Sequence, residues 1–99
     1  MNSDFPDVET IEKEAIPGLA FPHDDVLSDP AQQLQRRHDA ERASKLGNSY
    51  QGKVTIYFQT HEGITRRVQT TIWAVHEEYV TLKAGITLPL RSIIRFDFQ

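Results

Sequence analysis

Apolar and polar residues alternate along much of the chain between Val54 and Phe98, and this pattern constrains the fold more than any other feature. A period of two is typical of strands that bury one face, whereas an amphipathic helix repeats every 3.6 residues. Turn residues, including Gly63 and the pair 84–85, divide the pattern into five short predicted strands. The predicted inward residues are Val54, Ile56 and Phe58 of the first strand, Val68, Thr70, Ile72 and Ala74 of the second, and Val80 and Leu82 of the third; Ile86, Leu88 and Leu90 carry the fourth, and Ile94, Phe96 and Phe98 the fifth.

The second predicted strand runs from Ile64 to about Val75, well beyond the usual length of roughly 5–6 residues. We therefore expect it to bend or bulge midway and to contribute to both sides of a curved sheet. Such curvature implies a small antiparallel barrel. Pro89 cannot donate a hydrogen bond to a neighbouring strand, so it is expected at an edge or at a strand end.

Residues 29–47 carry the start and stop signals of a helix. Asp29 is suited to the N-cap, Pro30 to the first helical position and Gly47 to a left-handed stop. The apolar residues between them form no continuous stripe at the helical period, so we expect a mostly solvated helix. Its predicted role is to cover one open end of the barrel, and the alternative is a dedicated binding helix.

The chain before the helix is acidic and weakly hydrophobic. Residues 1–27 hold seven acidic side chains and one lysine, with prolines at positions 6, 17 and 22. Such composition does not offset the entropy lost on ordering, so we predict a disordered tail over 1–27 and one folded domain, helix plus barrel, over 28–99. The tail is either a solubilising leader or a segment that folds on binding a protein partner. In the second case the contacts would come from Phe5, Ile11, Ile16, Leu19 and Phe21.

Composition excludes several classes of protein. The 99 residues include no cysteine, so disulfides and thiolate chemistry are absent and folding must rest on packing. No apolar run approaches the roughly 20 residues that span a bilayer, and the acidic start is unlike a secretory signal. We predict a soluble, cytoplasmic protein that does not associate with membranes.

A helix followed by five short, strongly bent strands resembles the Sm-like and SH3-like small β-barrels. The resemblance covers residues 29–98 and rests on KVTIYFQT with HEGI as first strand and hairpin, YVTLKAG as third strand, and LPLRSIIRF as last turn and strand. Sm-like proteins, including the bacterial Sm-like RNA chaperones, form rings and bind RNA, so the resemblance implies an RNA-binding hypothesis. The chain also resembles small bacterial proteins with this layout, for which the resemblance implies no activity.

Basic and aromatic side chains interleave on the predicted non-core face. Alternation places Tyr57 and Trp73 there, joined by Tyr79, whereas the neighbours Arg66 and Arg67 point to opposite faces. Rings stack on bases and cations neutralise phosphates, so a single-stranded RNA platform is one prediction. A protein-interaction or self-assembly module is the other. The candidate nucleic-acid-binding residues are Tyr57, Arg66, Arg67, Trp73 and Arg91.

No catalytic or metal site is predicted. Four histidines are present, but the pairs 61–62 and 76–77 put His and Glu on turns or on opposite sides of a strand. The sequence His23-Asp24-Asp25 offers metal ligands without the fixed geometry that a site requires, because it lies in the predicted tail. We therefore expect a non-enzymatic binding module without metal or cofactor.

Self-association is predicted to be limited. The unpaired edges of the fourth and fifth strands would favour pairing between copies, but Pro89 interrupts the fourth. A monomer or a homodimer is therefore expected in place of a ring.

Overall fold

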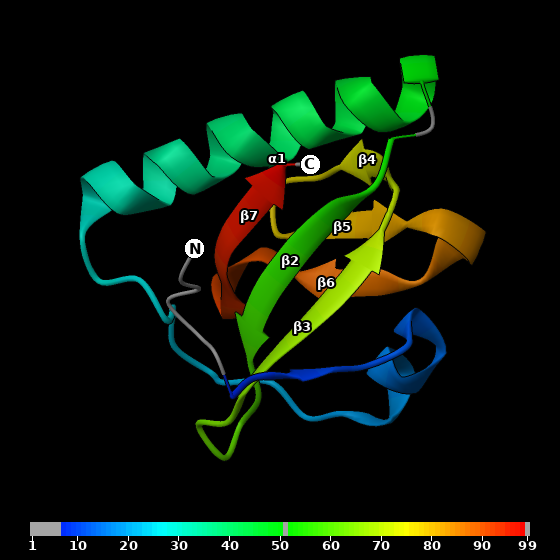
Figure 1. Ribbon diagram of the computed structural model, residues 1–99. Coiled ribbons are helices and arrows are strands. Elements are labelled where there is room, and N and C mark those ends of the chain that lie inside the picture. Colours follow the sequence, from blue (N-terminus) through cyan, green and yellow to red (C-terminus); the bar gives the residue numbers. More distant parts are fainter. Residues whose placement is uncertain (1–6, 51, 99) are drawn as a thin grey trace.

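The computed structural model describes residues 7–50 and 52–98 as a mainly β fold with one α-helix (Figure 1). Its elements are β1 (Glu9–Thr10), the 3-10 helix η1 (Lys13–Gly18), α1 (Pro30–Tyr50), β2 (Val54–Gln59), β3 (Thr65–Thr70), β4 (Ile72–Val75), β5 (Tyr79–Leu82), the 3-10 turn η2 (Lys83–Gly85), β6 (Thr87–Pro89), the 3-10 turn η3 (Leu90–Ser92) and β7 (Ile93–Phe98). None of the described helices combines the length and hydrophobicity of a membrane span.

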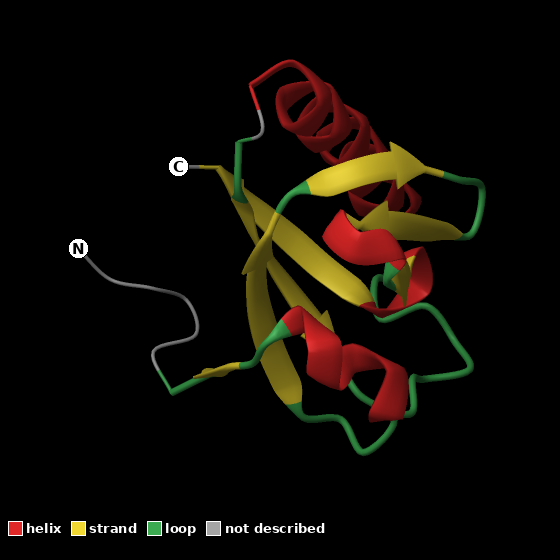
Figure 2. Cartoon of the chain, turned by 90° about the vertical axis from the view of Figure 1, so that its right-hand side faces the viewer, coloured by secondary structure: helices red, strands yellow, loops and turns green. Residues whose placement is uncertain are grey.

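The strands form two sheets, with the orders β1-β3-β2-β7 and β4-β5-β6. We call them sheet A and sheet B. In sheet A, β2 lies antiparallel to both β3 and β7, so the first and last predicted strands are neighbours. Helix α1 lies across β4 and β7, at one end of both sheets (Figures 1 and 2). Among the described strands β6 pairs only with β5 and β7 only with β2, so the pairing does not close into a single barrel.

The predicted bend in the second strand is confirmed. Thr71 separates β3 in sheet A from β4 in sheet B and is itself buried. Immediately afterwards the pairing of β4 with β5 is irregular between Ile72 and Ala74, which marks a bulge at Trp73. Ala74 consequently pairs with Thr81 on the outer face, so its predicted inward position is wrong.

A second irregularity changes which residues of β7 enter the core. The register between β2 and β7 shifts after Tyr57, so that Ile56 opposes Phe96 but Phe58 opposes Ile93. Ile93 is fully buried and Ile94 is only partly buried. The predicted inward position of Ile94 is therefore wrong, because strict alternation does not continue through a bulge.

Helix α1 begins as predicted and ends differently. The Asp29 carboxylate accepts a hydrogen bond from the Ala31 N–H at 3.0 Å, which confirms the N-cap. The helix continues past Gly47 to Tyr50, so the predicted stop at Gly47 is wrong. Gly47 is instead buried against β4, where an added Cβ would collide with the carbonyl oxygen of Ile72. This glycine allows the helix to approach the sheet closely.

The buried face of α1 consists of small residues and one arginine. Ala40 and Ala43 have no exposed surface, and Arg36 is 7% exposed. These positions recur at helical spacing with Gly47, so the helix does have a packing stripe, although not one made of large apolar side chains. The role predicted for the helix, covering one end of the sheets, agrees with its contacts to β4 and β7.

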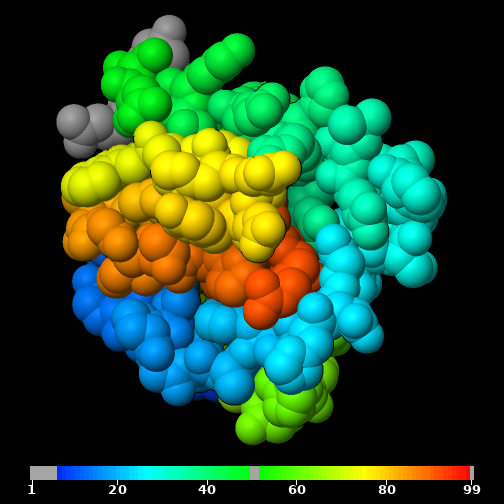
Figure 3. All heavy atoms as spheres, turned by 180° about the vertical axis from the view of Figure 1, so that it is seen from behind, coloured from blue at the N-terminus to red at the C-terminus, as the bar shows by residue number. Residues whose placement is uncertain are grey.

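Residues 7–27 are packed against the sheets, so the prediction that they are disordered is wrong. β1 adds to the edge of β3, and the Ile11 N–H donates to the Arg67 carbonyl at 2.9 Å. Ile16 of η1 is 1% exposed and belongs to the core. Figure 3 shows this segment, in blue, beside the orange residues that contain β6. Phe5 and the rest of residues 1–6 lie outside the described residues.

The physical reason is that this segment is ordered by partners remote in the sequence. Its apolar residues have no helical or strand period, and it is rich in acidic groups. The edge of β3 and the open side between the two sheets supply the missing hydrogen bonds and apolar surface. Ile11, Leu19 and Phe21 are partly buried against the core in this way.

Candidate nucleic-acid interface

The five predicted site residues lie in separate places. Tyr57 and Arg67 are register partners on the outer face of sheet A, whereas Trp73 lies on sheet B. Arg66 opposes Phe58, so it shares the core-side face and confirms that the two adjacent arginines diverge. Arg91 belongs to η3. The structure therefore does not assemble one platform from all five.

Tyr57 lies in a row with two arginines across sheet A. Its register partners are Arg67 on β3 and Arg95 on β7, and the Arg95 guanidinium lies 5.3 Å from the ring centroid. Arg95 also pairs with Asp97 at 2.8 Å. Tyr57 is only 4% exposed, so its ring does not offer a stacking surface to a base. Arg95 was not predicted, although alternation along IIRFDF could have indicated its face.

The three predicted arginines all contact the segment 7–27, which was expected to be disordered. Arg66 lies 3.5 Å from the Glu9 carboxylate, and Arg67 Nε donates to Thr10 Oγ1 at 2.6 Å. Arg91 Nε donates to the Pro22 carbonyl at 2.6 Å. These side chains therefore hold the N-terminal segment against the sheets.

The outer face of sheet B carries exposed aromatic rings. Trp73 is 46% exposed and Tyr79 is 41% exposed. The ring of Tyr79 stacks on His76 with centroids 4.4 Å apart and an interplanar angle of 27°, and His76 Nε2 lies 3.1 Å from Thr81 Oγ1. Tyr79 alternates with the buried Val80, so it faces away from the core. We call Trp73, His76 and Tyr79 the aromatic face.

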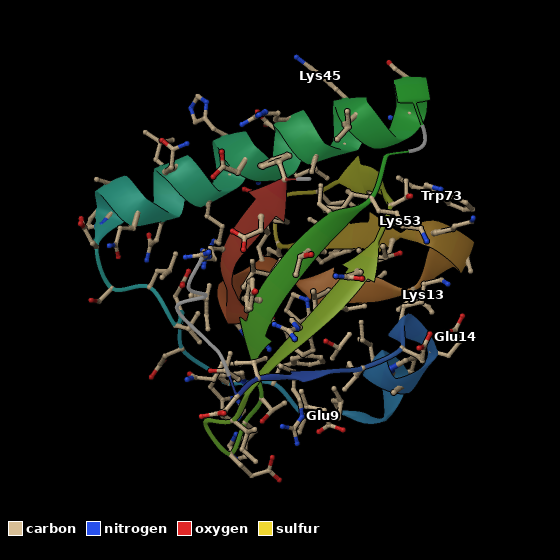
Figure 4. The ribbon with its side chains drawn as sticks, viewed as in Figure 1. Glu9, Lys13, Glu14, Lys45, Lys53 and Trp73 are labelled. Carbon is tan, nitrogen blue, oxygen red and sulfur yellow. The ribbon has the colours of Figure 1, made fainter. Side chains whose placement is uncertain are left out.

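Three exposed lysines come from elements next to the Trp73 end of this face. Lys45 follows Ser44, whose Oγ lies 3.5 Å from the Trp73 carbonyl oxygen. The Lys83 N–H donates to the Thr71 carbonyl at 2.9 Å, and Lys53 directly precedes β2. Figure 4 shows Trp73 and Lys53 below the C-terminal half of α1, whereas Lys45 projects from that helix away from the sheets.

These lysines carry charge available to a ligand. Lys45, Lys53 and Lys83 are exposed, and no carboxylate of the described residues forms an ion pair with them. The opposite end of the aromatic face is acidic, since Glu77 and Glu78 are exposed in the turn before Tyr79. The face thus has a basic end at Trp73 and an acidic end at Tyr79. The lysines could not be grouped from the sequence, because they are up to 38 positions apart and lie on elements that only tertiary packing brings next to one another.

A groove of about 500 Å³ lies between the first turns of α1 and the turn that joins β4 to β5 (Figure 3). At its base Arg36 forms hydrogen bonds of 2.8 and 2.6 Å with both carboxylate oxygens of Asp25 and a third of 2.9 Å with the Ile93 carbonyl. Arg37 closes one side through the carbonyls of residues 76 and 77. Arg36 and Arg37 thus use several donors for contacts within the chain. Glu77 and Glu78 also line the groove, and Arg36 Nε is buried without a hydrogen-bond partner among the described residues.

The Asp25 carboxyl is stabilised in its charged form. Partial burial by itself would raise its pKa, but hydrogen bonds from Arg36 and from the Leu27 N–H, together with the Arg36 charge, outweigh that effect. The pKa of Asp25 consequently lies below its ordinary value. This ion pair links the end of the N-terminal segment to α1, so it is a structural contact.

Within residues 7–50 and 52–98, no group of three or more His, Cys, Asp or Glu side chains is arranged around a common point as a metal cluster would be. Comparisons of the chain with protein-family models, with curated proteins and with solved structures find no match.

Proposed function

We propose that this protein is a non-enzymatic binding module that takes single-stranded RNA on the Trp73 end of the aromatic face. The observation that carries the proposal is the half-exposed indole of Trp73, together with exposed lysines on the elements that border its strand. A base stacked on an aromatic side chain contributes about 1–3 kcal/mol in a sequence-tolerant way. Lysines on the bordering elements would neutralise phosphates of the strand on either side of the stacked base.

We further propose that the fold is an open relative of the Sm-like and SH3-like small barrels. In support, the first and last long strands pair, the second strand bends between the sheets, and a 3-10 turn precedes the last strand. The short β6 ends at Pro89, which supports a monomer or homodimer over a ring. Light scattering on the purified protein tests this, and a mass of six or more chains would contradict it.

The test of RNA binding is a fluorescence-polarisation titration with short, mixed-sequence single-stranded RNA at two salt concentrations. We expect Trp73→Ala to weaken binding by about 5- to 150-fold, the range that corresponds to one lost stacking contact. Leu34→Ala is the matched control, because Leu34 is 60% exposed on α1 and lies outside the aromatic face. Equal affinities for the two variants would exclude the proposed face.

The lysines are tested by the salt dependence of the same titration. Replacing Lys45, Lys53 and Lys83 with Gln should weaken all RNA sequences alike and flatten the dependence of log affinity on log salt by about 0.7 per lost phosphate contact. Lys13→Gln is the control, since Lys13 already pairs with Glu14 at 3.1 Å.

A protein partner on the same face is the second candidate. Trp and Tyr are among the residues that anchor protein interfaces, and the acidic end at Glu77 and Glu78 is unsuited to phosphate. This alternative predicts that the protein does not bind RNA, and that a partner's affinity depends on Trp73 with little response to salt.

A further inference from the structure

Two histidines from distant parts of the chain meet at the end of the molecule opposite the helix. His23 lies in the segment before α1 and His61 lies in the turn after β2, yet their ring centroids are 5.8 Å apart with an interplanar angle of 83°. Both side chains are exposed. Neither belongs to the aromatic face, so this pair is independent of the proposed RNA site.

The backbone holds both histidines in place. The His61 N–H donates to the Ala20 carbonyl at 2.9 Å, and the ring of Phe21 packs on the buried Phe58 with centroids 6.1 Å apart. Arg91 adds one contact before His23 and one after it. Its side chain donates to the Pro22 carbonyl, and its backbone carbonyl accepts a hydrogen bond from the Val26 N–H. His23 is therefore held on both sides, in contrast to the mobile position that its sequence suggested.

The hairpin that carries His61 is equally defined. The Gly63 N–H donates to the Thr60 carbonyl at 2.9 Å, and Gly63 has the positive φ of 84° that was expected for this turn. The Thr60 N–H donates to the Ile64 carbonyl at 2.9 Å. The two imidazoles thus project from ordered backbone on each side.

Their separation suits a shared metal ion. A Zn–N bond of about 2.0–2.1 Å, with about 1.1 Å more from nitrogen to ring centre, places each centroid about 3.2 Å from a bound ion. At a tetrahedral angle two such centroids lie about 5.2 Å apart. The observed 5.8 Å lies within about 1 Å of that value, and both rings are exposed and able to turn toward a shared ion.

The flanking charges favour a cation. Asp24 and Glu62 follow the two histidines directly, and both are exposed. No described lysine or arginine forms an ion pair with either carboxylate. Imidazole suits Zn²⁺, Ni²⁺ and Cu²⁺, whereas Mg²⁺ and Ca²⁺ prefer oxygen ligands.

We propose that His23 and His61 form a two-imidazole site for a divalent transition-metal ion, represented by Zn²⁺, with water in the remaining positions. A bound ion would connect the N-terminal segment to the β2–β3 hairpin across 38 positions of sequence. Because the ion binds only when both segments are docked, it stabilises the folded chain by mass action.

The site is tested by calorimetric titration of the full chain with ZnCl₂ and by imidazole ¹H–¹⁵N spectra of the wild-type protein. We expect one ion per chain and simultaneous shifts of the His23 and His61 signals. His23→Gln and His61→Gln should each weaken binding about tenfold or more, since loss of a group that only supports a metal ligand already costs about 10–100-fold. His38→Gln is the control, because His38 is exposed on α1, and it should bind Zn²⁺ as the wild type does.

A thermal melt supplies a second readout. Zn²⁺ should raise the Tm of the wild type and of His38→Gln, but not that of His23→Gln or His61→Gln. The proposal is overturned if Zn²⁺ at millimolar concentration does not bind, if only one of the two imidazole signals shifts, or if His38→Gln weakens binding as much as the other substitutions. Because the spectra are those of the wild type, this result does not depend on how the variants fold.

Discussion

The outer faces of the two sheets differ in what their aromatic and basic residues contact. On sheet A, Tyr57 is buried between Arg67 and Arg95, and both arginines bind groups of the same chain. On sheet B, Trp73 and Tyr79 are more than two-fifths exposed, and the nearby lysines have no ion-pair partner among the described residues. The same alternation of aromatic and polar residues thus produces one face whose aromatic ring is buried and one face whose rings are exposed.

The difference shows that residue type alone does not tell which side chains are still able to bind a ligand. What matters is whether their polar groups and rings are already engaged within the chain. An arginine donor that already binds another group must lose that contact before it can bind phosphate, whereas the remaining donors of the guanidinium keep that capacity. Arg66, Arg67 and Arg91 each have at least one such contact, whereas Lys45, Lys53 and Lys83 have no ion-pair partner among the described residues. The proposed RNA site therefore lies on sheet B.

The largest expected effect tests whether segment 7–27, which these arginines contact, is an integral part of the fold. Ile16→Ala removes most of a side chain that is 1% exposed, so we expect the free energy of unfolding to fall by about 2–4 kcal/mol. Urea denaturation measures this. Ile64→Ala is the matched control. Because Ile64 is 42% exposed, its truncation should lower the free energy of unfolding by less than about 0.5 kcal/mol. Similar small effects would mean that the segment is not docked.

A second substitution tests the close contact between α1 and β4, the strand that carries Trp73. Gly47→Ala would place a methyl group against the Ile72 carbonyl and the Thr71 side chain, so α1 must move away from β4. We expect a loss of about 1–3 kcal/mol, the usual cost of overpacking, despite the better helix propensity of alanine. Gly18→Ala is a control with no atom within 4 Å of the added Cβ. If Gly47→Ala were as stable as the wild type, the close helix contact would be refuted.

Acid should loosen the N-terminal segment by a smaller amount. The pKa of Asp25 is depressed in the folded chain, so its contribution to stability is present above the ordinary carboxyl value of about 3.9. That contribution is lost as the pH falls from there through the folded pKa. Urea midpoints at pH 6 and pH 3 for the wild type and Asp25→Asn measure it. The wild type should lose more stability than the variant over this interval, and an equal loss would contradict the assignment.

The smallest expected effect sharpens the comparison of the two faces. Arg67→Gln removes an exposed hydrogen bond to Thr10, so it should change stability by less than about 1 kcal/mol. It should also leave RNA affinity unchanged, in contrast to Trp73→Ala. If Arg67→Gln lowered RNA affinity as much as Trp73→Ala does, the binding site would instead lie on sheet A.

The strand pattern was predictable from the sequence because burial on one face imposes a period of two. Val54, Ile56 and Phe58 are buried as expected, as are Val80 and Leu82, although Thr55 and Tyr57 on the opposite face of β2 are buried as well. The predicted turn at Gly63 and the N-cap at Asp29 are also confirmed, since both depend on neighbours only a few residues away. Local chemistry determines local geometry in each case.

Tertiary structure decided where the pattern shifts and which side chains remain open. The bulges that turn Ala74 outward and bring Ile93 inward arise from the pairing of separate strands. Gly47 signals a helix end in the sequence, but packing against Ile72 gives it another role. The order of residues 7–27 likewise depends on contacts with β3 and β6, which no local period can encode. Those long-range contacts also decide which arginines are engaged, which lysines lack an ion-pair partner among the described residues, and that His23 meets His61. The reason is that a side chain's remaining capacity to bind is set by its neighbours in space.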